Sequence, residues 1–349
     1  MSTAHDATSA DRGTPARGLD PASGLLPHIG LLRFTGPDAH AFLQGQVSND
    51  VRRLSEGSPL LAAYSTAQGR VVALMRLLPH SSGVMALLPQ DILQPTLERL
   101  RKFVLRAKVV IEDLSGQFAV IGEHRAADLG AAGLPIPDAA GYVEQDGIGI
   151  GRVSSGSGRH WVIGPAARLA EHRLARQGLD ADPGGQLRAQ RIERDWRLAD
   201  IRAGLPQVYA ATCEMFVAQM LNLDLIDGIS FSKGCYTGQE IIARTQHLGR
   251  IKRRMFRLQL PPGTWSIGQA LRLGDGRSGR LTELAPLGAE SRSASGGEFV
   301  PPAEALAVLN LEAGAADAEA APGVAAPGVA APGEAVAAVQ LPLPYPVGA

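Results

Sequence analysis

The sequence predicts an α+β protein in which short strands and a few helices follow one another along the chain. Apolar segments of strand length recur, as at 71–75, and turn residues such as those at 67–69 lie between them. A later segment, 94–104, instead spaces its apolar residues three and four apart, which indicates a helix with one buried face. Towards the C-terminus, short alternating strands and frequent turns are typical of a small antiparallel barrel.

The first part of the chain is expected to alternate strands with helices after a disordered arm at residues 1–20. The arm combines small polar residues with three aspartates, which fits neither a signal peptide nor a transit peptide, so we expect a cytoplasmic protein. The expected elements are, in order, a strand at 31–34, a helix at 39–46 capped by Asp38, a hairpin at 64–78, a strand at 84–88 and the helix at 94–104.

The middle and C-terminal parts are expected to form two further units. Short strands at 118–121, 148–150 and 161–163 precede a helix at 166–176, and a second helix at 186–200 places Ile192 and Trp196 on one face. Residues 311–340 hold 13 alanines and three near-identical pentapeptides, a composition that cannot bury enough apolar surface to fold. We therefore expect a disordered insertion at about 313–337, followed by an edge strand at 339–345.

These elements predict three domains. The first is formed by residues 21–112 together with 186–250, the middle α+β domain by 113–185, and the C-terminal antiparallel β-barrel by 251–349.

Composition excludes several classes of protein. The chain has 349 residues with 34 Lys+Arg against 34 Asp+Glu, whereas domains that bind nucleic acid usually carry a basic excess, so direct RNA binding is not expected. No apolar run approaches the length needed to cross a membrane. Its two cysteines, Cys213 and Cys235, are too few for a disulfide framework, and no spacing suggests a metal site.

Cys235 is the most chemically suggestive residue. Gly234 and Gly238 on either side allow tight turns, and a helix starting at Gln239 together with Lys233 would favour the thiolate. The same cysteine could instead be a small buried apolar residue. A Cys/His hydrolase or a metal centre would need partners that the sequence does not place beside the sulfur.

Two other features leave alternatives open. Residues 241–257 contain six Lys or Arg and no acid, which is consistent either with an anion site or with the solvated face of a strand. Trp196 lies on the apolar stripe of its helix, where an indole either packs in the core or stacks on a heteroaromatic ligand.

The motif Lys233-Gly-Cys-Tyr-Thr-Gly-Gln-Glu240, followed by Ala243-Arg244, resembles the signature of the YgfZ family of folate-binding proteins, which are related to the aminomethyltransferase of the glycine cleavage system. The resemblance covers most of residues 28–260. It implies a three-domain clover-leaf around a folate channel, with tetrahydrofolate as cofactor. It also implies a role in assembling or repairing iron–sulfur clusters, with iron–sulfur proteins, including tRNA-modifying enzymes, as partners.

The resemblance also implies site residues. Trp196 matches the family tryptophan that contacts folate, and Ile29 stands where some members have a second one. We expect Arg202 or Arg244 to face the glutamate tail of folate. The motif residues Lys233, Cys235, Tyr236, Gly238, Gln239 and Glu240 are expected at the rim, with Cys235 and Lys233 as candidate catalytic groups and with no metal ligand among them.

One departure from the related enzymes concerns their catalytic acid. The corresponding strand reads Gly69-Arg-Val-Val-Ala-Leu-Met-Arg76 here, and the chain has no Asp or Glu between Glu56 and Asp91. Without a carboxylate near the folate nitrogens, aminomethyl transfer lacks its proton-handling group, so glycine-cleavage activity is rejected. A folate-dependent one-carbon transferase that uses Cys235 is kept as the alternative to a binding protein.

Overall fold

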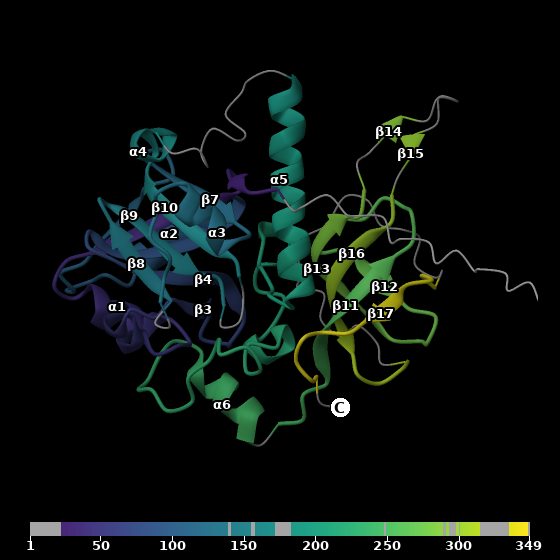
Figure 1. The fold of residues 1–349 in the computed structure, drawn as a ribbon. Coiled ribbons are helices and arrows are strands. Elements are labelled where there is room, and N and C mark those ends of the chain that lie inside the picture. Colours follow the sequence, from purple (N-terminus) through teal and green to yellow (C-terminus); the bar gives the residue numbers. More distant parts are fainter. Residues whose placement is uncertain are drawn as a thin grey trace, which may run out of the picture.

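The computed structural model describes residues 22–138, 141–154, 158–171, 183–247, 249–288, 291–292, 298–299, 301–314 and 335–347. Helices and antiparallel sheets alternate along the chain, which confirms the predicted α+β class (Figure 1). The expected arm at 1–20 and most of the expected insertion lie outside the described residues. No helix in the described ranges is long and apolar enough to cross a membrane.

The first sheet has the strand order β3-β4-β5-β2-β6. Every expected element of this region is found. The sheet and its helices are β2 (Ile29–Thr35), α1 (Ala39–Gln46), η1 (Val51–Glu56), β3 (Leu60–Ser65), β4 (Val71–His80), β5 (Gly83–Pro89), α2 (Gln90–Arg101) and β6 (Val110–Asp113).

Two local expectations in this region are corrected. Asp38 precedes α1 but makes no side-chain cap; its carboxylate accepts a hydrogen bond from the backbone N–H of Lys108 at 2.6 Å, so it joins two distant loops instead. Helix α2 starts at Gln90 and ends at Arg101, and both ends come earlier than expected. The early start follows from Pro89, which ends strand β5 and leads directly into the helix.

The second sheet has the order β1-β7-β10-β9-β8, and it packs face to face on the first. Its elements are β1 (Gly24–Leu25), β7 (Phe118–Glu123), α3 (Ala126–Ala131), β8 (Tyr142–Gln145), β9 (Ile148–Arg152), β10 (His160–Pro165) and α4 (Ala166–Glu171). The core between the two sheets includes Leu31 and Met85 of the first, and Val120 and Trp161 of the second.

The third sheet has the order β12-β13-β16-β11-β17. Its strands are β11 (Arg253–Leu260), β12 (Ala270–Arg272), β13 (Ser278–Pro286), β16 (Ala303–Asn310) and β17 (Val339–Leu341), and a separate ribbon pairs β14 (Ser291–Arg292) with β15 (Glu298–Phe299). Strand β17 lies at the sheet edge as expected. Among the described residues, the two edges of this sheet approach at an isolated parallel bridge, Leu273 to Val336, and not through a continuous ladder of strands.

Helix α5 (Pro183–Arg202) connects the three sheets. It packs against β13 and β16 on one side and β1 on the other, and it stands between the two halves of the molecule in Figure 1. After it, the chain crosses the first sheet through η2 (Ala210–Thr212) and η3 (Ala218–Leu221) to α6 (Gln239–His247), which begins where the motif predicts. The motif therefore lies on the first sheet, and α5 faces all three.

Candidate functional site

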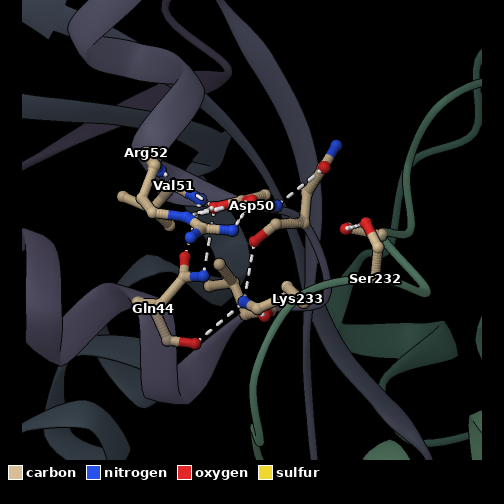
Figure 2. Close-up of polar contacts among 9 residues, drawn as sticks. Gln44, Asp50, Val51, Arg52, Ser232 and Lys233 are labelled. Carbon is tan, nitrogen blue, oxygen red and sulfur yellow. Dashed lines mark hydrogen bonds and ion pairs between the residues drawn. The ribbon is translucent and has the colours of Figure 1, made fainter.

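Lys233, the first residue of the motif, is anchored to the end of helix α1. Its ammonium donates to the carbonyl oxygens of Gln44, Val47 and Asn49 at 2.8, 2.7 and 2.8 Å (Figure 2). The last carbonyls of a helix lack partners within the helix, and a cation near them is favourable. Since an ammonium has three protons, this arrangement leaves none for a ligand. Lys233 thus fastens the motif loop to α1.

The surroundings of Lys233 are partly buried and polar. Burial lowers the pKa of Lys233 to about 8, and the ammonium lies 4.9 Å from the ring of Tyr236. Nearby, the Asp50 carboxylate accepts hydrogen bonds from Arg52 and Gln44, and mainly the Arg52 bond lowers its pKa (Figure 2). These contacts fix the turn that carries the three carbonyl acceptors.

The remaining motif residues follow the same contact surface towards α6. Thr237 donates its backbone N–H to the carbonyl of Gly45, and Gly238 has a positive φ of 84°. A Cβ at Gly238 would lie 2.6 Å from the carbonyl oxygen of Thr66, so the close approach of the two loops requires glycine. Gln239 is half-buried, whereas Cys235, Glu240 and Arg244 are exposed.

The two cysteines differ in accessibility, which predicts a difference in labelling. Cys235 is exposed, while Cys213 is half-buried and burial raises the pKa of its thiol. Because the thiolate is the nucleophile, iodoacetamide at pH 7.5 is expected to label Cys235 at least about tenfold faster than Cys213. Peptide mass spectrometry over a time course measures both rates, and equal rates would count against a reactive Cys235.

Trp196 lies in a different place, on α5 between the first two sheets. Its side chain is 1% exposed and its ring meets that of Trp161 edge-on, with 4.6 Å between centroids. His124 lies against it at 5.3 Å, and the guanidinium of Arg159 lies 4.8 Å from the ring centre. Gly122 makes room, since a Cβ there would lie 2.4 Å from Cε3 of Trp196. One face of the indole is therefore covered by Arg159.

Several buried polar atoms beside this indole have no hydrogen-bond partner within the described ranges. We call this group the inner polar cluster. It comprises Nε and Nη2 of Arg76, Nε2 of His124, Nε1 of Trp161 and Nε1 of Trp196. The Arg76 guanidinium lies 5.8 Å from the ring centre of Trp161. Buried polar groups are nearly always hydrogen-bonded in native proteins, so such a group of them marks a place for a polar ligand or for water.

Ion pairs along α5 border this cluster. Arg159 pairs with Asp200 at 2.8 Å, with both side chains buried. Arg197 pairs with Glu283 of β13 at 3.0 Å, and the Tyr209 hydroxyl donates to the same carboxylate at 2.5 Å. Burial raises the pKa of both Tyr209 and Glu283. The carboxylates here are thus held by their own cationic or phenolic partners.

Two histidines near the cluster predict a loss of stability in acid. Burial lowers the pKa of His28 and of His124 to about 4, below the usual 6.5. Between pH 6.5 and 4 the unfolded chain therefore binds protons that the folded chain does not. Stability is complete above pH 6.5 and falls as pH drops towards 4, by on the order of 3 kcal/mol per histidine.

Urea unfolding at pH 7, 6, 5 and 4 measures this dependence. The double variant His28→Gln/His124→Gln should show a weaker dependence of stability on pH than wild type. The control His40→Gln, at an exposed position, should show the same dependence as wild type. A wild-type profile as flat as that of the double variant would show that neither histidine titrates as described.

The structure brings some of the sequence-predicted residues together and separates others. Ile29 and Trp196 belong to the same apolar cluster between the two sheets. Arg202, at the end of α5, pairs with Glu304 of β16 at 2.8 Å, and its expected place at the glutamate tail of folate stays a prediction. Arg244 is exposed on α6.

The motif and Trp196 lie at opposite ends of one strand segment. Gly238 packs on Gly69 just before β4, whereas Trp161, the neighbour of Trp196, lies beside Arg76 in β4. Seven positions of extended chain separate Gly69 from Arg76, which is about 20 Å. No described contact joins Cys235 to Trp196, so their expected sharing of one cavity stays a prediction.

The basic segment at 241–257 largely serves the fold. Arg254 is buried against Asp224 at 2.6 Å, and Arg257 pairs with Glu304 at 2.6 Å. Arg250 pairs with Glu312 at 2.9 Å. Arg254 and Arg257 therefore fit neither an anion site nor a solvated strand face, because their ion pairs join β11 to neighbouring elements, whereas Arg250 and Lys252 are exposed.

Arg76 is the functional candidate that sequence reasoning missed. It is a lone charge in Val71–His80, where seven of the first eight residues are apolar and the row of side chains is buried. A charged residue inside a fully buried strand is a signal in itself, because strands buried on both faces are otherwise apolar. Arg159 and His124 carry no such signal, since neither lies within an apolar strand.

The fold and the inner polar cluster define an α+β protein with a buried polar site between two sheets. No family model matches the sequence. The chain is 33% identical over 230 residues to a tRNA-modifying protein YgfZ from Colwellia psychrerythraea, covering 64% of this chain and 67% of that protein. It is 31% identical over 231 residues to the YgfZ protein of Serratia proteamaculans, covering 66% and 68%.

The chain therefore belongs to the YgfZ family. Among solved structures, it is similar to the glycine cleavage system aminomethyltransferase T from Bartonella henselae, with a TM-score of 0.47 and 17% identity. That comparison covers 82% of this chain and 78% of the other.

Proposed function

We propose that this protein binds tetrahydrofolate at the inner polar cluster and acts in iron–sulfur cluster assembly or repair, and thereby in tRNA modification. The observation that carries the binding site is the set of buried N–H groups that lack partners among the described residues, beside two indole rings that meet edge-on. A pterin is flat and rich in hydrogen-bonding atoms, so it suits such surroundings. The role in tRNA modification is supported by the names of the two YgfZ relatives.

The residues of the cluster fit a pterin in definite ways. The indole nitrogens of Trp161 and Trp196 are donors for carbonyl oxygens or ring nitrogens of a ligand. Because Arg159 covers one face of Trp196, the indole serves as a wall and a donor rather than as a platform open on both faces. When bound, tetrahydrofolate supplies nitrogen atoms that can carry a one-carbon unit.

The proposal also covers the domain architecture of the protein and its place in the cell. The three sheets are consistent with a three-domain clover-leaf with the boundaries predicted from the sequence. We place the protein in the cytoplasm, with folate and iron–sulfur proteins as partners. A one-carbon transferase that uses Cys235 is less well supported, because the motif that carries Cys235 contacts the Gly69 end of β4 through Gly238.

Two measurements test this function. Equilibrium dialysis of the full-length protein with tetrahydrofolate, kept reduced, should give saturable binding at one site per chain. In cells that lack their own family member, the wild-type gene should restore the thiolation of tRNA by an iron–sulfur enzyme. Absence of saturable binding would overturn the folate assignment, and absence of restored thiolation would overturn the cellular role.

A further inference from the structure

Arg76 stands apart from the other buried charges of the molecule. Its side chain projects from the middle of β4, and the residue is 4% exposed. Its Nε and Nη2 atoms have no hydrogen-bond partner in the described part of the chain, and none of the ion pairs described there includes it. By contrast, Arg159 and Arg197 each hold a carboxylate.

The carboxylates nearest to Arg76 are already engaged. Asp200 is bound by Arg159, and Glu283 is bound by both Arg197 and Tyr209. They attract Arg76 only from beyond contact distance, and burial lowers its pKa. A buried charge without a partner is strongly unfavourable. Such a charge is expected where a bound molecule supplies the missing partner.

The chemistry of the guanidinium limits what that molecule offers. It carries only donors, arranged as a fork that matches one carboxylate or a carbonyl with a neighbouring acceptor. Trp161 lies beneath it at 5.8 Å, and the indole nitrogens of Trp161 and Trp196 are also donors. The site therefore presents several N–H groups and favours a ligand edge that is rich in oxygen.

We infer that Arg76 is a ligand-binding residue that recognises an oxygen acceptor, a carbonyl or a carboxylate, of the molecule bound in the inner polar cluster. The inference rests on the proposed function, which supplies two sources for that oxygen in tetrahydrofolate. One is the carbonyl of the pterin ring and the other is the glutamate tail. Arg76 thereby sets the affinity of the site for its ligand.

The test compares wild type with Arg76→Met and Arg76→Lys by isothermal titration calorimetry and by thermal unfolding without ligand. Methionine removes an unpaired buried charge, so the melting temperature of the free protein should stay the same or rise. The affinity for tetrahydrofolate should fall by at least about tenfold, which is the scale of one hydrogen bond to a charged group. Lysine keeps the charge without the fork and should give an intermediate loss.

A matched control is Arg33→Met. Arg33 lies on β2 of the same sheet, separated from β4 by β5, and it pairs with Glu112 at 2.8 Å, so its replacement should leave the affinity within about twofold of wild type. A wild-type affinity in Arg76→Met overturns the inference, whatever the melting temperature. A lower melting temperature with unchanged affinity assigns Arg76 to the fold and overturns it too.

Two fragments separate the sources of the oxygen. If a tetrahydropterin without the tail loses affinity in Arg76→Met, the acceptor is the ring carbonyl. If p-aminobenzoylglutamate loses affinity instead, the acceptor is the tail carboxylate. If Arg76→Met binds both fragments and the whole ligand as tightly as wild type does, the inference is contradicted. Wild type that fails to bind tetrahydrofolate defeats the proposed function itself, whereas wild-type binding that Arg76→Met retains defeats only the role of Arg76.

Discussion

Replacing Lys233 by methionine is expected to lower the free energy of unfolding by about 3 kcal/mol or more. The side chain would keep much of its length, but three carbonyl oxygens at the end of α1 would lose their shared donor. A buried acceptor left without a partner costs roughly 1–3 kcal/mol, and hydrogen bonds to charged groups lie at the upper end of such values. Urea unfolding at pH 7 measures the change.

The matched control for this variant is Lys252→Met. Lys252 lies in the basic segment close to the motif in sequence, but its side chain is exposed, so the change should stay within about 0.5 kcal/mol. If Lys233→Met and Lys252→Met unfolded alike, the anchoring of the motif loop by Lys233 would be wrong. Faster proteolysis of the loop in Lys233→Met alone would support it further.

Replacing Gly122 by valine is expected to have the second large effect. Any Cβ at this position of β7 would lie 2.4 Å from Cε3 and 2.7 Å from Cζ3 of Trp196, and 2.8 Å from Leu26. The indole is 1% exposed and contacts Trp161 and Arg159, so moving it away from β7 would disturb both contacts. Overpacking of a tight core costs about 1–3 kcal/mol, and this contact with a rigid ring should reach the upper end.

Gly130→Ala serves as the control for Gly122→Val. Gly130 lies in helix α3, which packs on β7, and the nearest atom to its added Cβ is 3.9 Å away. An alanine in a helix is more favourable than glycine, so this variant should be neutral or slightly stabilising. Thermal unfolding and the near-ultraviolet dichroism of the tryptophans report both changes. An unperturbed spectrum in Gly122→Val would mean that Trp196 does not lie against β7.

Much of the fold follows from local patterns in the sequence. The hairpin around Gly69 is predictable because a residue with a positive φ, here 72°, is needed at the turn and glycine provides it. Strand β17 is predictable as an edge strand because Pro342 directly after it cannot continue a ladder. The start of α2 is harder to predict, since Pro89 ends one element and begins the next.

The site depends on contacts between distant parts of the chain, which explains what the sequence could not reveal. Lys233 reaches Val47 across 186 positions, and nothing near either residue announces the pairing. The covering of Trp196 by Arg159 depends on how α5 packs on the second sheet. Resemblance to the family pointed to Trp196, but only the three-dimensional arrangement places it against Trp161, whose ring lies beside Arg76.

The central claim is that tetrahydrofolate binds at the inner polar cluster, and fluorine NMR of protein labelled with 5-fluorotryptophan tests it most directly. The chain has three tryptophans, so three resonances are expected, and single Trp→Phe variants assign them. Trp265 lies with the third sheet and its indole already donates to the carbonyl of Pro261, which makes it an internal reference. Addition of tetrahydrofolate should shift the resonances of Trp161 and Trp196 and leave that of Trp265 in place; saturable binding that moves neither of the first two would contradict the account.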